Sequence, residues 1–160
     1  MDEWFEKQRK ELLRIIEKFT PEDGTHETEV PGLRFIRSSR ISEPVYSVYE
    51  PSLCVVAQGS KVVMLGQEVY QYDPSSYLTA SVQLPITGQV MEASNETPYL
   101  SLQILFDMNQ ILDVIQASDD AIRAGNETSR GLKVSQLNDT LLDAVLRLVK
   151  LVETPRDIPV

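Results

Sequence analysis

Short runs of β-forming residues, separated by turn signals, fill residues 49–106 and constrain the fold of this chain more than any other feature. The clearest pair is residues 62–65 and residues 68–72, which flank the dipeptide Gly66-Gln67. Glycine at the first central position suits a type II′ hairpin turn, because glycine adopts a positive φ without strain. Several short strands at this spacing favour a small barrel or sandwich, an architecture that often holds its ligand inside.

A third strand of this segment is expected at residues 77–82, after the turn signal at residues 73–76. Polar Thr79 and Ser81 alternate there with apolar residues, the period-two pattern of a strand whose two faces differ. We favour the face of Tyr77, Thr79 and Ser81 as the one that points into the barrel, since small hydroxyl residues leave room for a ligand. In the alternative, an apolar face lines the interior; it consists of Leu78, Ala80 and Val82.

Two segments ahead of these runs also favour strands. Residues 25–38 suit strands interrupted by one Pro-Gly pair, and residues 45–50 are bracketed by Pro44 and Pro51. Because proline cannot donate a backbone hydrogen bond, residues 45–50 are expected at the edge of a sheet or in a loop.

Several motifs in the chain resemble one family of proteins. They are residues 49–59 (YEPSLCVVAQG) followed by Lys61, residues 72–78, residues 84–88 and residues 98–100, with further matches at residues 23–24, 27–28, 31–33 and 153–159. Together they resemble the N-terminal domain of AraC/XylS-type bacterial transcription regulators. The resemblance implies a mainly β fold with flanking α-helices, in which a cupin-like small β-barrel is followed by an α-helical dimerisation segment.

The resemblance also implies a function and a division of the chain. Residues 1–24 would be an N-terminal helix and turn, residues 25–106 a cupin-like, effector-binding β-barrel, and residues 107–160 a helical dimerisation or linker segment. The expected function is effector sensing and dimerisation. DNA would be bound only through a C-terminal helix-turn-helix domain that is absent from this chain.

Composition narrows the classes of partner. At 160 residues, with 42% hydrophobic residues, the chain is long enough for one domain with its own core. A net charge of −9 repels nucleic acid, so we do not expect this chain to bind DNA by itself. No apolar run approaches the ~18 residues that cross a bilayer, and the acidic N-terminus does not fit a secretory signal. We therefore expect a cytoplasmic protein with no membrane contact.

Helical periodicity appears at both ends of the chain. Residues 2–19 have apolar residues at helical spacing, and residues 108–117 predict a second helix. Residues 126–133 are polar and predict a loop. Ser135 then suits the N-cap of a longer helix that runs to about Val152.

Two apolar stripes on this last helix suggest a dimer interface. The first stripe, which we favour for dimerisation, has heptad-type spacing and consists of Leu141, Val145, Leu148 and Val152. The second consists of Leu142, Leu146 and Val149 and would face the barrel, although the two roles could be exchanged. The expected partner is a second copy of the chain. If the last helix does not make the dimer, the N-terminal helix is the next candidate, through Leu12, Ile16 and Phe19.

Residues equipped for catalysis are scarce. Metal-dependent cupins need two or three histidines, and His26 is the only histidine in the chain, so we expect no metal and no cofactor. His26 suits a surface or turn role, and Cys54, the only cysteine, suits a buried structural thiol. Asp73 and Glu92 are the carboxylates that could act in acid–base chemistry. A metal-independent cupin-type enzyme, an isomerase or epimerase, is one alternative to a non-enzymatic sensor. A structural interaction domain with a collapsed, ligand-free barrel is another.

Polar side chains on the expected strands are the candidate ligand-binding residues for an unknown small-molecule effector. They supply neutral hydrogen-bonding groups and aromatic walls, as small-molecule pockets do. The set consists of Gln58, Tyr72, Tyr77, Thr79, Ser81 and Gln89.

Overall fold

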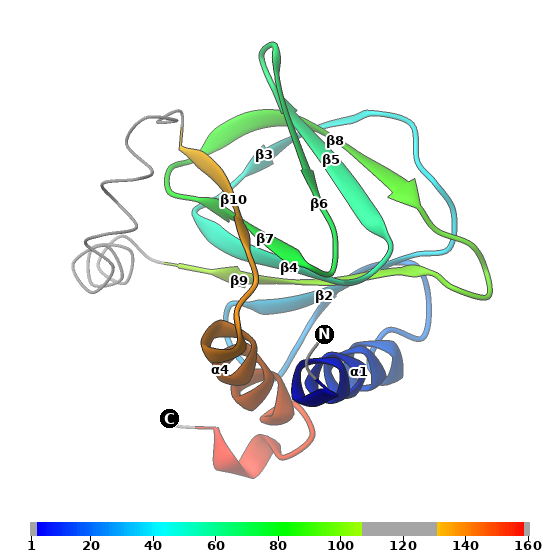
Figure 1. Ribbon diagram of the computed structural model, residues 1–160, viewed down its shortest axis with the longest axis vertical. Coiled ribbons are helices and arrows are strands. Elements are labelled where there is room, and N and C mark those ends of the chain that lie inside the picture. Colours follow the sequence, from blue (N-terminus) through cyan, green and yellow to red (C-terminus); the bar gives the residue numbers. More distant parts are fainter. Residues whose placement is uncertain (1–2, 107–130, 159–160) are drawn as a thin grey trace.

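Two antiparallel sheets face each other and form an open, cupin-like barrel with helices on one side (Figure 1). The structure is a computed structural model, and it describes residues 3–106 and 131–158. The first sheet has six strands, in the order β1 (Gly24–Glu27), β2 (Leu33–Ser38), β9 (Tyr99–Leu105), β4 (Ser52–Gln58), β7 (Ser76–Ala80) and β10 (Leu132–Gln136). The second has four, in the order β3 (Val45–Tyr49), β8 (Leu84–Glu92), β5 (Ser60–Leu65) and β6 (Glu68–Tyr72). The expected fold class, mainly β with flanking α, is confirmed.

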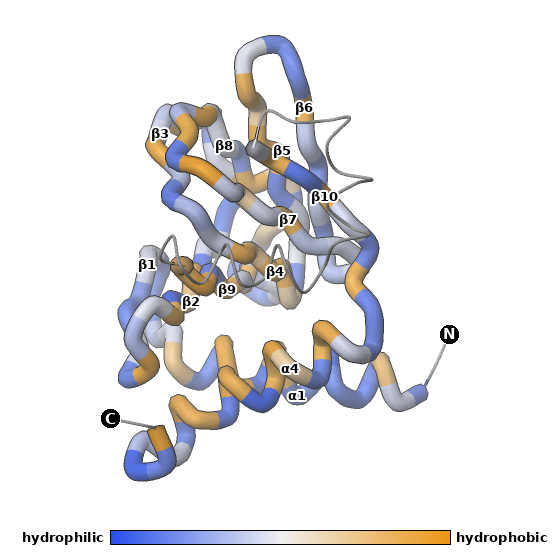
Figure 2. Tube along the Cα trace, turned by 90° about the vertical axis from the view of Figure 1, so that its left-hand side faces the viewer, coloured by the Kyte–Doolittle hydropathy of each residue, from blue (hydrophilic) through white to orange (hydrophobic). Residues whose placement is uncertain are grey.

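Two helices cover the outer face of the six-stranded sheet. Helix α1 (Glu3–Lys18) and helix α4 (Asp139–Lys150) lie side by side beneath the barrel in Figure 1, and a short 3-10 helix, η2 (Pro155–Asp157), follows α4. Their apolar residues face the sheet, as the colouring in Figure 2 shows. Both helices are amphipathic, so burial of their apolar faces against the sheet holds them in place.

The six-stranded sheet separates two apolar clusters. The helix-side cluster lies between this sheet and the helices; its strand residues are Leu33, Phe35, Leu53, Val55, Ala57, Leu100 and Leu102. The barrel cluster lies between the two sheets; its buried members are Cys54, Val56, Val63, Leu65, Tyr72, Leu78, Ala80, Ile86, Tyr99 and Leu132. Successive residues of a strand point to opposite faces, so β4 and β9 contribute to both clusters in alternation.

The hairpin between β5 and β6 forms as the sequence predicts. Leu65 pairs with Glu68, so Gly66 and Gln67 are the two residues of the turn. Gly66 has a φ of +61°, whereas Gln67 does not have a positive φ. A type I′ turn would need a positive φ at both positions, so the turn is the expected type II′.

The N-terminal helix and the edge strand are also confirmed. The helix expected at residues 2–19 is α1, and it ends before Thr20, whose Oγ1 donates a hydrogen bond of 2.8 Å to the carbonyl oxygen of Ile16. The segment bracketed by Pro44 and Pro51 is β3, which lies at the edge of the four-stranded sheet.

The expected start of the last helix is wrong. Ser135 does not cap a helix but lies within β10, which pairs with β7 and extends the six-stranded sheet. The N-cap is Asn138, whose Oδ1 accepts a hydrogen bond of 2.8 Å from the backbone N–H of Leu141. The predicted loop is wrong at its end as well, because Leu132 and Lys133 belong to β10. The helix expected at residues 108–117 lies outside the described residues.

The two stripes of α4 are less distinct than their spacing suggests. Val145 and Val152, two members of the stripe that we favoured for dimerisation, are only 3% and 4% exposed because they pack into the helix-side cluster. Leu141 and Leu148 keep part of their surface exposed. The second stripe is buried, with Leu142 and Val149 fully enclosed and Leu146 nearly so.

Helix α4 should be essential for stability because its second stripe is part of the core. We expect Leu142→Ala to lower the free energy of unfolding by about 3 kcal/mol, since the substitution removes buried methyl groups and leaves a cavity. Urea denaturation followed by circular dichroism measures this change. The matched control, Lys150→Ala at an exposed position of the same helix, should change the free energy by less than about 0.5 kcal/mol.

Candidate functional site: the interior of the barrel

The apolar face of β7, rather than its polar face, points into the barrel. Leu78 and Ala80 are buried in the barrel cluster, whereas Tyr77 contacts the helix-side cluster. Our preference for the face of Tyr77, Thr79 and Ser81 is therefore wrong. The physical reason is that the outer face of this sheet is covered by helices instead of solvent, so an aromatic residue can be buried on either side.

Four of the six candidate ligand-binding residues lie outside the barrel interior. Tyr77 and Thr79 are on the outer face of β7, where the hydroxyl of Thr79 lies 3.4 Å from the carbonyl oxygen of Lys133. Ser81 is exposed beyond the end of β7. Gln89 is on the outer face of β8, since its neighbours Gly88 and Val90 face inward.

The other two candidates have different positions. Gln58 is at the end of β4, where its side-chain amide donates a hydrogen bond of 2.8 Å to the carbonyl oxygen of Pro98 and so ties two loops together. Tyr72 is 2% exposed and lies in the barrel cluster. Tyr72 is therefore the member of the predicted set that lies at the centre of the interior.

Tyr72 is one of a group of polar side chains that the two sheets bring together. Tyr49 comes from β3, Cys54 from β4, Lys61 from β5 and Tyr99 from β9. The hydroxyl of Tyr72 interacts with those of Tyr49 and Tyr99. We call these five residues, Tyr49, Cys54, Lys61, Tyr72 and Tyr99, the interior polar cluster.

Lys61 has the most unusual position in this cluster. Its Nζ donates a hydrogen bond of 2.6 Å to the hydroxyl oxygen of Tyr49 and lies 5.1 Å from the centre of the Tyr49 ring. Its aliphatic arm crosses Gly88 on β8. Burial lowers the pKa of the Lys61 ammonium, since the apolar surroundings disfavour its charged form.

The other members of the cluster are held neutral. Burial raises the pKa of Tyr49 and of Tyr72 well above the ordinary tyrosine value, and it raises the pKa of Tyr99 in the same way. Burial also raises the pKa of the Cys54 thiol, although the nearby Lys61 acts in the opposite direction. Cys54 is therefore a protonated, buried thiol, as the sequence predicts, and a poor nucleophile.

Neither of the two candidate acid–base carboxylates lies in the interior polar cluster. Asp73 stabilises the turn after β6, where its Oδ1 accepts hydrogen bonds from the backbone N–H and the hydroxyl of Ser75. These hydrogen bonds lower the pKa of Asp73. Glu92 is exposed and accepts a hydrogen bond of 3.1 Å from the hydroxyl of Ser60.

His26 lies near the surface, which is one of the two positions that the sequence predicts, but in a strand and not in a turn. It lies in β1, and its Nε2 is 2.7 Å from the carbonyl oxygen of Glu22. In the described ranges, 3–106 and 131–158, no three His, Cys, Asp or Glu side chains gather into a group that could hold a metal ion.

Alternation along β5 is the signal that could have identified Lys61. Lys61, Val63 and Leu65 share one face of the strand, and the two apolar residues are buried. A lysine on the buried face of an amphipathic strand is unusual, because a buried charge needs a partner. The sequence analysis recorded Lys61 only as part of a motif and did not ask which face it shares.

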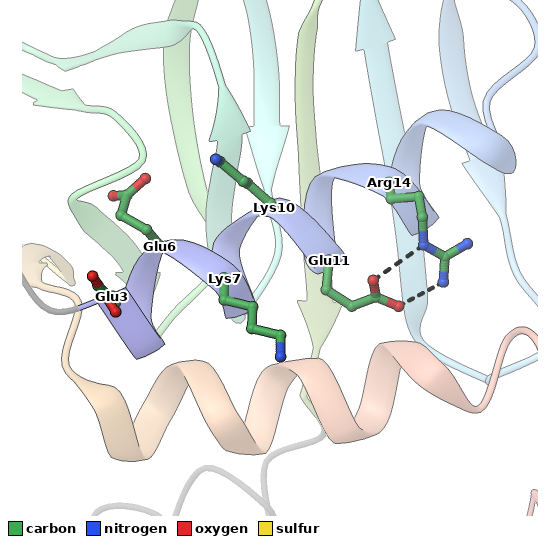
Figure 3. A pocket seen from close by; sticks show the side chains of 6 residues that line it. All are labelled: Glu3, Glu6, Lys7, Lys10, Glu11 and Arg14. Atoms are coloured by element: carbon green, nitrogen blue, oxygen red, sulfur yellow. Dashed lines mark hydrogen bonds and ion pairs between the residues drawn. The ribbon is translucent and has the colours of Figure 1, made fainter.

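Two surface hollows lie away from the interior polar cluster. The larger, of about 530 Å³, lies on the exposed side of α1 and is lined by Glu3, Glu6, Lys7, Lys10, Glu11 and Arg14. Figure 3 shows these side chains along α1, with an ion pair between Arg14 and Glu11. The smaller, of about 270 Å³, lies between Phe19, Val152 and the turn after β1. Both lie on the helix side, and neither is lined by a member of the interior polar cluster.

The fold is that of a cupin-like domain, and a comparison with family models identifies the family. The family model for the AraC-type transcriptional regulator N-terminus matches residues 29–160, which is most of the chain. The chain therefore belongs to this family, as its motifs predict. A comparison with curated proteins finds no match.

Solved structures give distant likenesses. ToxT from Vibrio cholerae is 11% identical, with a TM-score of 0.49, over 73% of this chain and 46% of that one. Salicylate 1,2-dioxygenase from Pseudoaminobacter salicylatoxidans is 10% identical, with a TM-score of 0.34, over 87% of this chain and 37% of that one. The AraC-like transcriptional activator CuxR is 9% identical, with a TM-score of 0.33, over 78% of this chain and 50% of that one. This chain thus spans about half the length of the two regulators or less, and at these TM-scores none of the three assigns it a ligand.

If Lys61 serves ligand binding and not folding, the wild-type chain should have a lower free energy of unfolding at neutral pH than a variant with an apolar residue at this position. We expect Lys61→Met to raise the free energy of unfolding by about 1 kcal/mol and Tm by ~3 °C, since it replaces a partly buried cation with an apolar chain of similar length. Calorimetry at pH 7 measures the change. A clear loss of stability would mean that Lys61 holds the fold together.

The pH dependence of this difference follows from the lowered pKa of Lys61. The unfolded chain binds the proton more tightly than the folded chain, so wild-type stability rises with pH above the lowered pKa and up to the ordinary value of 10.5. Below the lowered pKa the penalty is fully present. The advantage of Lys61→Met should therefore shrink from pH 7 to pH 10, and an advantage that does not change with pH would contradict the assignment.

Proposed function

We propose that this chain is the effector-sensing domain of an AraC-type transcriptional regulator and that it binds a small molecule among the residues of the interior polar cluster. The observation that carries the proposal is a lysine and three tyrosines collected from four strands inside a largely apolar barrel. Such a barrel folds well with an apolar interior, and buried polar groups reduce stability unless they are fully paired. A few polar groups among apolar walls are what ligand recognition requires.

A route from the barrel to the helices supports a sensing role. Cys54 and Tyr99 face the interior, while the next residues along the same strands, Val55 and Leu100, contact the helix-side cluster. A ligand that favours one position of β4 or β9 would therefore also favour one packing of α4. In a regulator with an attached DNA-binding domain, that change would reach DNA through α4. We propose that the DNA-binding domain, and not this chain, makes the contact with DNA. We also propose a cytoplasmic location, because a bacterial transcriptional regulator acts where the DNA is.

A non-enzymatic role is the better reading of the chemistry. A metal-independent isomerase or epimerase would need an acid–base pair facing its substrate. The two candidate carboxylates, Asp73 and Glu92, accept hydrogen bonds from serine residues outside the cluster. We therefore do not propose an enzyme.

Ligand binding should be visible as thermal stabilisation. We expect at least one member of a library of small metabolites to raise Tm by roughly 5–10 °C at a concentration of 100 times its dissociation constant, because it binds only the folded chain. Tyr72→Phe, which removes one interior hydroxyl, should weaken this shift. The matched control is Gln89→Ala, on the outer face of β8, which should leave the shift unchanged. Equal losses in both variants would place the ligand elsewhere.

We also propose that the chain forms a homodimer through the exposed side of α4. Of the four residues first assigned to the interface, Leu141 and Leu148 retain surface that a second copy could cover. A symmetric dimer places the same patch on both subunits, so one substitution acts twice. We expect Leu148→Glu to give a monomer with an unchanged circular dichroism spectrum, and light scattering measures the molar mass.

Val145→Glu is the comparison for this experiment. Val145 is buried within its own chain, so the glutamate should unfold the protein instead of only separating two copies. A wild-type chain that is monomeric at high concentration would contradict the dimer. A dimer that survives Leu148→Glu would exclude this face of α4.

A further inference from the structure

The ammonium group of Lys61 has no anionic partner among the residues that the structure describes. The groups that act on it are the hydroxyl of Tyr49, 2.6 Å away, and the buried thiol of Cys54. Both are neutral, because burial raises the pKa of each. A largely enclosed cation that has only neutral partners among the described residues is costly, and the cost falls when an anion comes within hydrogen-bonding distance.

The barrel also leaves room for Lys61 in a specific way. Gly88 of β8 lies under the lysine arm, and a Cβ added there would be 3.2 Å from Cε and 3.7 Å from Nζ of Lys61. The backbone of Gly88 is not in the left-handed region, so glycine is not needed for its conformation. Its missing side chain is therefore what lets the lysine arm cross the strand.

The walls around the ammonium are aromatic and apolar. Tyr72 and Tyr99 are each 2% exposed, and the surrounding interior is formed by residues such as Val63 and Ile86. Such walls suit the apolar body of an organic molecule. Tyr49 lies on the edge strand β3, whose other residues are exposed, so its hydroxyl is the interior group best placed to give way to a ligand.

We propose that the effector is an organic monoanion, a carboxylate on an apolar body, whose carboxylate binds the ammonium of Lys61 inside the barrel. The proposal rests on the proposed function and gives its ligand a chemical class. One ammonium neutralises one negative charge, which favours a carboxylate. A phosphate monoester carries a charge of about −1.5 to −2 at pH 7, so one lysine would leave it partly uncompensated.

Matched probes with the same apolar body test this class. Octanoate, methyl octanoate, octanamide and octyl phosphate form one series, and benzoate, methyl benzoate, benzamide and phenyl phosphate form a second. Binding of each to the 160-residue chain would be measured by thermal shift and by titration calorimetry. We expect a carboxylate to bind at least tenfold more tightly than its ester, its amide and its phosphate counterpart.

Two variants connect this preference to the site. Lys61→Met should remove the preference for the carboxylate over its amide, while Lys150→Met, which removes the same charge from the surface of α4, should keep it. Gly88→Ala should weaken the carboxylate alone by pressing on the lysine arm, and circular dichroism checks that the fold is intact. The two variants act on the site independently, so the test survives if one of them fails to fold.

The outcomes separate the inference from the proposed function. If esters and amides bind as tightly as acids, or if Lys61→Met keeps the preference, the barrel senses a ligand but the monoanion class is wrong. If a phosphate binds most tightly, the class is wrong in the same way. If no probe in either series stabilises the wild-type chain, the monoanion class is wrong, and the proposed function is overturned as well only if the metabolite library also fails to stabilise it.

Discussion

Burial of both faces of the six-stranded sheet is the constraint on which the rest of this structure depends. Every residue from Ser52 to Ala57 in β4 is buried, because one face packs on the helices and the other faces the second sheet. Removing α1 or α4 would expose the apolar outer face, and removing the four-stranded sheet would expose the inner one. The helices are therefore part of the fold of the barrel and not attachments to it. A strand that contacts both layers also connects them mechanically.

This double burial explains which parts of the fold the sequence could predict. Local signals were sufficient for the Gly66-Gln67 turn and for α1, since each depends on residues close together in the chain. They were insufficient for β10, whose pairing with β7 joins residues about 50 positions apart, as between Leu132 and Ala80. Ser135 reads as a helix cap when only its neighbours are considered. Its actual place is set by a distant strand.

The candidate site was harder to predict for a related reason. On a strand with one face in water, polarity tells the inner face from the outer one, but we assigned Thr79 to the interior for another reason, namely that a small hydroxyl residue leaves room for a ligand. On β7 the outer face is next to a helix layer, so Tyr77 is partly buried there, while the apolar residues Leu78 and Ala80 face the interior. Tyr72 lies in the interior, and the opposite face of β6 is exposed. Lys61 was overlooked because a charged residue is normally assigned to the surface.

The edge strand β3 has a consequence for how this protein behaves in concentrated solution. Tyr46 is 73% exposed and Val48 53% exposed, and the far side of β3 has no neighbouring strand in the described sheet. An unpaired edge with apolar side chains is a template for another chain, and prolines on either side, Pro44 and Pro51, restrict it to five residues. Such a segment must avoid pairing with other copies of the chain as well as fold. Lengthening this strand would turn a tolerated edge into a nucleus for fibres.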